Sequence, residues 1–415
     1  SRFASSTPTT MTSTLNRSER LAAQLAEAIG TAHVLSDPAD LAPFLQDWRG
    51  RYFGAARCVV RPANTAEVAA VVRACVDAAV PVVPQGGNTS LCGAATPDQT
   101  GQAVVVNLSR MNRIAAVDPK NNTISVEAGC TLAAIQEAAR SVERLFPLAL
   151  ASEGSCQIGG NLSTNAGGVQ VLRYGNTRDL TLGLEVVLPS GEIWNGLRGL
   201  RKDNTGYDLK QLFIGAEGTL GMITGAVLKL FPLPRTQTTC WLNIVTPAAA
   251  VDLLNQAKSA FDAQLTAFEL ISESALGLVL KNILDATRPT VEAPWYVLAE
   301  FSDAKPAAVA HWLHSRLEEG MVADAVIAQS GAQSQKLWAL RENISEAQKI
   351  EGISIKHDVS VPVSAIPDFL ALADAKLEAS FPGIRVVAFG HVGDGNLHYN
   401  LSRPDAQDNK AFIDS

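Results

Sequence analysis

The chain has 415 residues, a formal net charge of -7 at pH 7 and a pI near 5.5. A single hydrophobic core is not expected at this length, so we predict two domains. The acidic balance disfavours a nucleic-acid-binding role, because phosphate contacts need a basic face. The sequence also lacks a run of about 18 apolar residues that could span a membrane. We therefore expect a soluble cytoplasmic protein, with an organelle matrix as the alternative.

The six cysteines are scattered along the chain, and no two of them form a C-x-x-C motif. This spacing is typical of buried free thiols in a reducing compartment rather than of disulfides or a zinc site. The first ten residues are rich in Ser and Thr, precede Met11 and show no core-forming pattern. We therefore expect residues 1–20 to form a disordered leader or tag.

The first half of the chain shows α/β patterning. Helical periodicity predicts a helix over residues 18–29 that ends at Gly30. A turn then precedes a second predicted helix, which runs to Cys75 with Thr65 as its N-cap. The remaining elements alternate as in a βαβ arrangement: strands at 80–83, 103–107 and 123–127, and a helix at 132–139. Two strands within 179–194 flank a hairpin turn at Pro189–Gly191, and a further strand is expected at 220–230.

Two prolines within residues 231–235 mark the expected domain boundary. We predict a first domain over residues 21–235 and a second over 236–415. The second domain should begin with a helix at 247–260, with Thr246 as its N-cap. Its other predicted elements are a strand at 295–300 and helices at 304–319 and 334–350. We expect strands and helices to alternate there around one antiparallel sheet.

Glycine is concentrated in three segments, 84–90, 154–168 and 215–221, although the G-x-G-x-x-G and P-loop motifs are absent. Glycine permits positive φ and close backbone approach, so successive N–H groups can form an anion-binding concavity. Each segment alone is more often a set of tight turns. Together they indicate one long ligand that lies across several loops.

The segment 386–401 has a hairpin signal, because Asp394-Gly395 suits a two-residue type I′ turn. That turn would place His391 directly opposite His398 on one face, with Cβ atoms about 4.5–5.5 Å apart. Asn400 would share this face. Two imidazoles so placed can bind one metal ion, for which zinc is favoured although Mn, Co or Fe also accept them. The alternative is a pair of surface histidines that stabilise the hairpin.

Two cationic residues precede this hairpin. Arg341 lies four residues before Ser345 in the predicted helix, so both side chains can contact one ligand. Lys356 and Asp358 project to the same side of a predicted strand at 354–361. Either cation alone would by default be a solvated surface residue.

These motifs together resemble the FAD-linked oxidases of the vanillyl-alcohol oxidase (PCMH-type) fold, in particular the D-2-hydroxyglutarate and D-lactate dehydrogenase branch. The resemblance covers about residues 40–405 and is carried by four segments: 84–90, 159–168, 215–221 and 390–398. It implies an α+β fold, with a two-subdomain PCMH-type FAD-binding domain and an α+β substrate (cap) domain built on an antiparallel sheet.

The resemblance also implies which residues contact FAD. The pyrophosphate should be cradled by Pro84, Gly86, Gly87, Asn88, Thr89 and Ser90. The ribityl chain and isoalloxazine should be lined by Gly154, Ser155, Ile158, Gly159, Asn161, Asn165, Gly167 and Gly168. Gly221 and Ile223 should lie near the adenine. Residues 84–90 contain neither His nor Cys, so we expect non-covalent FAD, although Cys92 and Cys156 leave covalent attachment open.

The substrate site follows from the same resemblance. Arg341 and Lys356 match residues that bind the distal carboxylate, and Ser345 stands where some members have Thr. Asn400, which is expected on the same face as the two histidines, is taken as a further substrate contact. His391 and His398 match metal ligands, so the catalytic set is His391, His398, Arg341 and Lys356. The family's third ligand and its general base belong to a Glu-His-Gly segment that we expect beyond Ser415.

The function implied is metal-assisted oxidation of a D-2-hydroxy diacid, such as D-2-hydroxyglutarate or D-malate, with hydride transfer to flavin N5. Electrons would then pass to a separate acceptor, for which the family suggests an electron-transfer flavoprotein. A homodimer stays open. Three alternatives remain: a D-lactate or glycolate dehydrogenase of the same family, a non-redox flavin enzyme of the same fold, and an FAD-binding electron-transfer subunit.

Overall fold

The computed structural model describes residues 17–404 and 408–414. The chain forms two compact units. The first takes in the chain up to Val142 together with Ser152–Ala166 and Thr181–Leu230. The second contains Glu143–Ala151, Gly167–Leu180 and Phe231–Ser415. Two short segments from within the first predicted domain therefore pack with the C-terminal half of the chain.

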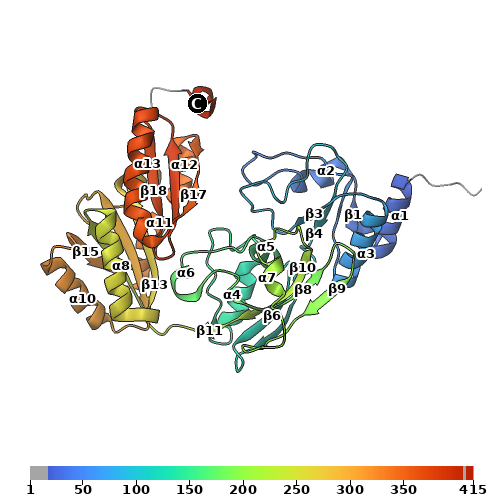
Figure 1. The fold of residues 1–415 in the computed structure, drawn as a ribbon, viewed down its shortest axis with the longest axis horizontal. Helices are drawn as coiled ribbons and strands as arrows, with labels where there is room; N and C mark the ends of the chain where they lie inside the picture. The colour runs from blue at the N-terminus through green and yellow to red at the C-terminus, as the bar shows by residue number, and fades with distance from the viewer. Residues whose placement is uncertain (1–16, 405–407, 415) are drawn as a thin grey trace, which may run out of the picture. The chain divides into compact units, whose positions relative to one another are not determined.

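A four-stranded sheet in the order β1-β2-β4-β3 begins the first unit. Its strands are Val34–Leu35, Cys58–Val60, Val104–Asn107 and Val82–Gln85 in that order. The valine-rich β2 and β4 are wholly buried and pair in parallel, as expected for strands covered on both faces. Helices α1 (Arg17–Ile29) and α3 (Thr65–Asp77) lie side by side against this sheet (Figure 1). Asn64 rather than Thr65 caps α3, because its side-chain oxygen accepts a hydrogen bond from Glu67 N–H.

The second sheet of this unit is antiparallel, with the order β5-β6-β10-β8-β9. Its strands are Ile114–Asp118, Thr123–Glu127, Met222–Lys229, Thr181–Val187 and Ile193–Gly196 in that order. The predicted hairpin around Pro189–Gly191 is confirmed as β8 and β9. The unit's shorter helical elements are η1 (Thr31–His33), α2 (Pro38–Leu41), η2 (Ala42–Phe44), α4 (Leu132–Arg140), α5 (Ile158–Ser163) and α7 (Lys210–Phe213).

An eight-stranded antiparallel sheet forms the centre of the second unit, in the order β15-β12-β14-β13-β18-β19-β16, with β17 also paired to β19. The strands are β12 (Gln237–Ile244), β13 (Leu265–Ser272), β14 (Trp295–Ser302), β15 (Asp324–Ile327), β16 (Ser354–Ile355), β17 (Asp358–Ser360), β18 (Arg385–His391) and β19 (Asn396–Ser402). The antiparallel sheet predicted for the second half is confirmed. A separate two-stranded ladder joins β7 (Arg144–Leu145) to β11 (Phe231–Pro232).

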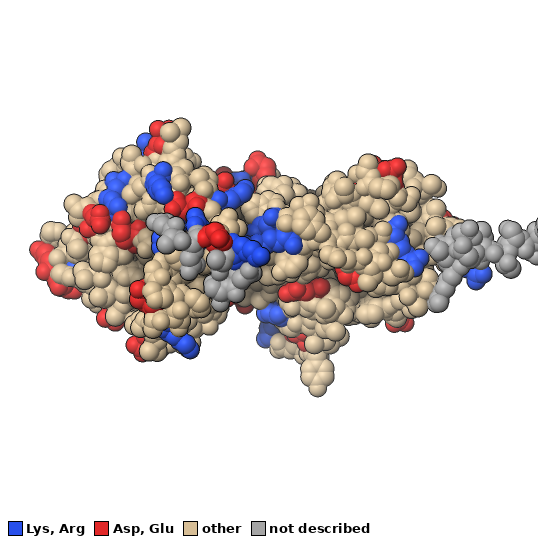
Figure 2. All heavy atoms as spheres, turned by 90° about the horizontal axis from the view of Figure 1, so that it is seen from above, with Lys and Arg blue, Asp and Glu red and all other residues tan. Residues whose placement is uncertain are grey.

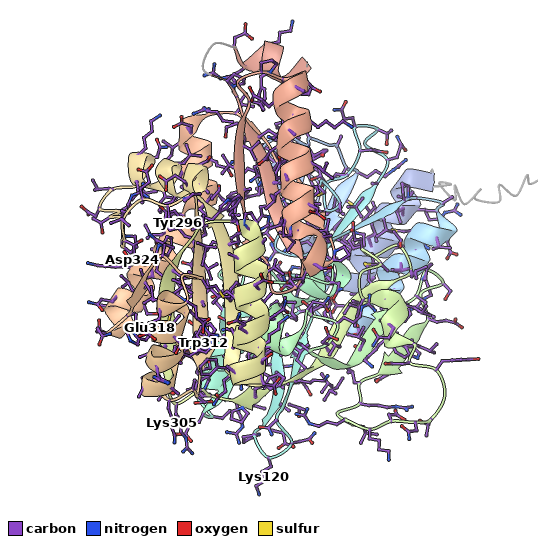
Figure 3. All side chains as sticks on the ribbon, turned by 60° about the vertical axis from the view of Figure 1, so that its left-hand side comes forward. Lys120, Tyr296, Lys305, Trp312, Glu318 and Asp324 are labelled. Carbon is purple, nitrogen blue, oxygen red and sulfur yellow. The ribbon has the colours of Figure 1, made fainter. Side chains whose placement is uncertain are left out.

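Helices cover both faces of this sheet. One face packs on α8 (Pro247–Phe261), α10 (Pro306–Glu318) and α13 (Ile366–Ser380). The other packs on α9 (Glu273–Asn282), α11 (Gly331–Glu342) and α12 (Ile344–Glu351). In Figure 3, Trp312 of α10 marks the first layer and Tyr296 of β14 contributes to the second. The remaining helical elements are α6 (Val171–Tyr174), η3 (Asp262–Gln264), η4 (Val363–Ala365) and α14 (Asn409–Asp414).

Four further expectations need correction. Helix α1 begins at Arg17, so residues 17–20 are helical rather than part of a leader, and residues 1–16 lie outside the described part of the chain. The helix predicted at 334–350 is broken at Asn343 into α11 and α12. The strand predicted at 354–361 is split into β16 and β17. Cys92 is exposed, whereas the other five cysteines are buried.

Two further observations concern the charged surface and the apolar length of the helices. Acidic and basic side chains are interspersed on the face of the second unit seen in Figure 2. No helix among the described residues is long and apolar enough to cross a membrane.

Candidate active site

Two of the glycine-rich segments pack directly against each other in the first unit. A side chain at Gly87 would place its Cβ 1.9 Å from the carbonyl oxygen of Ser155. A side chain at Gly86 would meet Gln157 at 3.5 Å. Only glycine permits this approach at position 87, so the residue type there is set by the neighbouring loop. The predicted meeting of segments 84–90 and 154–168 therefore has a steric basis.

The third glycine-rich segment joins the other two. The N–H groups of Gly215 and Glu217 donate to the carbonyl oxygens of Leu162 and Ser163, at 3.1 and 2.9 Å. A Cβ at Gly218, where φ is +78°, would lie 2.9 Å from the Pro84 ring. Three segments that are far apart in sequence thus form one cluster of loops, as expected for a long ligand.

Two buried polar atoms in this cluster have no partner within the described part of the chain. Gln157 Oε1 and Asn161 Oδ1 are buried, and neither has a hydrogen-bond partner among the described residues. A buried acceptor without a partner is costly, at about 1–3 kcal/mol, and is satisfied when a ligand donates to it. The cluster therefore fits a large ligand with several hydroxyl and N–H donors, such as FAD.

The other predicted flavin contacts are distributed as follows. Asn88, with φ +53°, donates from its side-chain nitrogen to the carbonyl oxygen of Gln46 at 2.8 Å, which fixes the first loop. Ile223 is buried within β10 opposite Val186. Only four members of the predicted set are buried: Ile158, Gly159, Asn161 and Ile223. Gly154 and Ser155 are exposed, and the other members, Gly221 among them, are half-buried. Gly167 and Gly168 belong to the second unit, whereas the rest of the set lies in the first.

The histidine hairpin forms, but with a different register from the one predicted. Its loop has four residues, 392–395, so His391 lies opposite Asn396 and His398 lies opposite Phe389. The register is shifted by two residues, so the two histidines still share a face but are diagonal neighbours rather than direct partners. Their ring centroids are 5.7 Å apart.

Tertiary contacts explain the longer loop. Gly395 has φ +85°, and a Cβ there would lie 2.1 Å from the carbonyl oxygen of Val361. The N–H of Val361 donates to the Gly395 carbonyl oxygen at 3.0 Å. The turn is therefore fixed to the chain segment after β17. Asp394-Gly395 is a local signal for a two-residue turn, but such a signal carries no information about the contact with Val361.

A buried glutamate connects the hairpin to α11. Glu269 of β13 is 1% exposed, and its Oε1 lies 2.6 Å from Nδ1 of His391. Its Oε2 accepts a hydrogen bond from Nε of Arg341 at 2.8 Å. Burial alone would raise the pKa of Glu269, whereas the positive charges of His391 and Arg341 hold that pKa well below its usual range. Burial would lower the pKa of His391, but the Glu269 carboxylate outweighs burial and raises it.

Sequence reasoning missed Glu269. The signal was available, because Glu269 is the single charged residue in the otherwise apolar or hydroxylated run Leu265–Ser272. A charged residue is almost never fully buried without a partner. A glutamate within a strand that is buried on both faces therefore indicates a buried ion pair, although the sequence does not identify its partners.

Arg341 is buried and paired with Glu269, so it is not the solvated surface residue that a lone cation would be by default. Its guanidinium carbon also lies 4.7 Å from the centre of the Phe389 ring. Its two Nη atoms form no hydrogen bond with any described residue. Ser345, predicted to share its ligand, is exposed and follows the helix break at Asn343, so the four-residue spacing does not bring the two side chains together in one helix.

Lys356 and Asn400 lie next to the histidines on the same sheet face. The register of β16 and β17 with β19 sets Lys356 opposite Asn400. The Asn400 side chain accepts from His357 N–H at 3.2 Å and donates to Gln348 Oε1 at 2.9 Å. Asn400 therefore replaces a ladder hydrogen bond at the split between β16 and β17.

In each of the two histidines, Nδ1 faces a carboxylate, which leaves Nε2 as the nitrogen that could hold a metal ion. Nδ1 of His391 is bonded to Glu269, and Nδ1 of His398 lies 3.4 Å from Oδ1 of Asp358. No described residue is bonded to either Nε2. Carboxylate contacts of this kind orient the histidine ligands of metals in proteins. Among the described residues, however, no group of three or more His, Cys, Asp or Glu side chains is gathered as a complete metal site.

A cavity of about 440 Å³ lies elsewhere in the second unit, between α11, residues 283–289 and β15. Apolar side chains such as Val279 and Leu337 line part of it. None of the predicted site residues contributes to its walls, so the chemistry is not assigned to it.

Comparison with known proteins agrees with this arrangement. Two family models match the chain: an FAD binding domain over residues 56–196, and the C-terminal domain of FAD linked oxidases over residues 233–412. A D-2-hydroxyglutarate dehydrogenase from Xanthomonas citri pv. viticola is 40% identical over 94% of this chain and 82% of its own length. The chain belongs to the D-2-hydroxyglutarate dehydrogenase family of FAD-linked oxidases.

Other members of the family are similarly close. The mitochondrial D-2-hydroxyglutarate dehydrogenase of Bos taurus is 38% identical, over 91% of this chain and 69% of that protein. The Stutzerimonas stutzeri enzyme is also 38% identical, over 94% of this chain and 84% of its own. The chain is thus an FAD-dependent hydroxyacid dehydrogenase, as the motifs predicted.

Solved structures show the fold. The chain is 18% identical to p-cresol methylhydroxylase with substrate bound, with a TM-score of 0.74 over 94% of this chain and 83% of that one. The chain is 19% identical to alkyldihydroxyacetonephosphate synthase, with a TM-score of 0.74 over 95% of this chain and 77% of that one. The predicted α+β, PCMH-type fold is confirmed.

Proposed function

We propose that this member of the family oxidises a D-2-hydroxy diacid to its 2-oxo acid, with D-2-hydroxyglutarate as the main substrate and D-malate as a shorter one. The observation that carries the proposal is the connected group Arg341–Glu269–His391, with His398 beside it on the same sheet face. It provides a cationic anchor next to a candidate metal site. The relatives named D-2-hydroxyglutarate dehydrogenase support the same substrate.

The two ends of a diacid would be held by different groups. His391 and His398 would hold a divalent metal ion, zinc being favoured for imidazole ligands, and the α-hydroxy carboxylate would bind there. The Nη atoms of Arg341, which no described residue engages, would bind the distal carboxylate together with Lys356. Asn400 would contact the substrate between these groups, whereas the exposed Ser345 would contribute only if the site closes around the ligand.

Oxidation removes a proton from the hydroxyl group, which a general base must accept, and a hydride from C2. When bound, the metal supplies a Lewis acid that lowers the hydroxyl pKa, and FAD supplies the hydride acceptor at N5. The protein residues orient the substrate: the imidazoles and Arg341 fix its two ends, which reduces the entropic barrier to reaction. The flavin would be held without a covalent bond by residues 84–90, 154–168 and 221–223, and its electrons would pass to a separate acceptor such as an electron-transfer flavoprotein.

A substrate comparison tests this proposal. Initial rates with D-2-hydroxyglutarate, D-malate, D-lactate and glycolate would be measured with a dye as electron acceptor, before and after treatment with a chelator. We expect the two diacids to have the highest kcat/KM and chelation to remove activity on all four acids. Equal kcat/KM values for D-lactate and the diacids would instead assign the enzyme to the D-lactate or glycolate dehydrogenases of the family.

A further inference from the structure

Glu269 lies between two side-chain nitrogens, and both can donate a hydrogen bond to it. Its two carboxylate oxygens face Nε of Arg341 and Nδ1 of His391, at 2.8 and 2.6 Å, and the side chain is only 1% exposed. Arginine in a protein is always a donor. An ionised carboxylate accepts hydrogen bonds only, so it can serve Arg341 and still require a proton on Nδ1 of His391.

The tautomer of His391 decides what its other nitrogen can do. In a neutral imidazole one nitrogen carries the proton and the other carries the lone pair, and the hydrogen bond made by one nitrogen sets the role of the other. A proton held on Nδ1 by Glu269 leaves the lone pair on Nε2. That nitrogen, which no described residue engages, can then ligate a metal ion.

We infer that Arg341 and Glu269 form a positioning pair that sets the tautomer of His391: Arg341 fixes the carboxylate, and the carboxylate fixes the proton on Nδ1. Arg341 thus has a role in the metal site in addition to its proposed role at the distal carboxylate. This inference rests on the proposed metal-binding role of His391, but the tautomer itself can be measured without metal.

The variant Glu269→Gln tests this positioning pair, because Arg341 and His391 would compete for its single acceptor oxygen. An amide has one acceptor oxygen and one donor nitrogen. Because Arg341 always donates, the amide oxygen of Glu269→Gln would turn to Arg341 and the NH₂ group would face His391. Nδ1 would then have to accept, the proton would move to Nε2, and the nitrogen needed for the metal would no longer have a lone pair.

Removal of Arg341 resolves this conflict. In the double variant Glu269→Gln with Arg341→Met, no donor competes for the amide oxygen, so it can accept from Nδ1–H of His391 and restore the original tautomer. The double variant also removes both buried charges, and a buried ion pair replaced by neutral side chains of similar volume is generally tolerated. We therefore expect loss of metal binding in the single variant Glu269→Gln and its recovery in the double variant.

Two measurements on the purified FAD-bound protein test the inference. The first is the pattern of ¹⁵N chemical shifts of the histidine side chains in metal-free protein at about pH 9, where unperturbed imidazoles are neutral; only six histidines are present. The second is the dissociation constant for Zn²⁺, from competition with a chromophoric chelator. Glu300→Gln is the matched control, because Glu300 is also buried and bonded to α11, through Trp338 Nε1 at 3.0 Å.

We expect Nδ1–H of His391 in the wild type, in Arg341→Met and in the double variant, and Nε2–H in Glu269→Gln. Zn²⁺ affinity should fall roughly ten- to a hundredfold in Glu269→Gln, as for other carboxylates that orient metal ligands, and should return to within about threefold in the double variant. Glu300→Gln should match the wild type in both measurements.

Three results would overturn the inference: Nε2–H in the wild type, wild-type Zn²⁺ affinity in folded Glu269→Gln, or a double variant that binds Zn²⁺ no better than Glu269→Gln. If Glu269→Gln alone does not fold, the inference is still tested by the tautomer of His391 in the wild type and by the Zn²⁺ affinity of the double variant relative to the wild type. A wild-type protein that binds no Zn²⁺, with no change in His398→Ala, would refute the proposed metal role and leave the tautomer measurement to decide the inference separately.

Discussion

Replacement of Arg341 by lysine separates the two tasks of this side chain. The guanidinium has enough donors to bond Glu269 through Nε, at 2.8 Å, and to offer both Nη atoms to a substrate carboxylate. An ammonium group is a single point charge, so the side chain introduced by Arg341→Lys could pair with Glu269 or with the substrate but could not reproduce both contacts. The diacid would lose a charge-assisted hydrogen bond of about 1.5–3 kcal/mol, which corresponds to a KM raised roughly ten- to a hundredfold.

The positive charge is retained, so we expect Arg341→Lys to fold. Truncation to alanine would instead leave the 1%-exposed Glu269 without its arginine, at a cost of about 3–5 kcal/mol in the free energy of unfolding. Steady-state kinetics would compare D-2-hydroxyglutarate with D-lactate, which has no distal carboxylate and whose KM should change by less than about threefold. If Arg341→Lys raises both KM values by the same factor, the role assigned to the Nη atoms is wrong.

Three further predictions concern the flavin, the metal and a buried carboxylate. Acid precipitation should release all the FAD into the supernatant, because segment 84–90 offers no His or Cys for a flavin bond, and fluorescence that stays with the pelleted polypeptide would contradict this. His398→Ala should lose the bound metal, as measured by elemental analysis, while its FAD content stays unchanged; stoichiometric metal in the folded variant would exclude His398 as a ligand. Hydrogen bonds from Lys281 and Arg385 lower the pKa of Glu351 from its ordinary 4.5 to about 2. The stability that Glu351 adds is therefore fully present above pH 4.5 and is lost as the pH falls toward 2. The midpoint temperature of thermal unfolding should be lower for Glu351→Gln than for the wild type at pH 7. This difference in midpoint should disappear as the pH falls from 4.5 to 2, and a difference that stays constant would contradict the argument.

Local sequence signals predicted those parts of the fold that depend on neighbouring residues. Thr246 caps α8 as expected, since its side chain accepts from Ala249 N–H. The glycines of segments 84–90 and 215–221 were identified by composition, and the structure gives two of them a steric reason in Ser155 and Pro84. The cap is encoded within three residues of where it acts, whereas the glycines stand out by composition although their steric reasons lie in distant segments.

The sequence did not predict features that depend on contacts between distant segments. The four-residue hairpin loop is explained by the contact between Gly395 and Val361, which a local turn signal does not report. The ion pairs of Glu269 join residues 72 and 122 positions apart in the chain. The break at Asn343 separates Arg341 from Ser345, although the apolar spacing continued across it.

Anaerobic reduction of the bound flavin tests the proposed oxidation most directly. Loss of the oxidised-flavin absorbance would be followed after mixing the FAD-bound protein with D-2-hydroxyglutarate, D-malate, D-lactate or glycolate, and with the L-enantiomer of 2-hydroxyglutarate as the control. We predict rapid bleaching by D-2-hydroxyglutarate, slower bleaching by D-malate and D-lactate, and none by the L-enantiomer. A flavin that stays oxidised with every one of these acids would contradict the central claim.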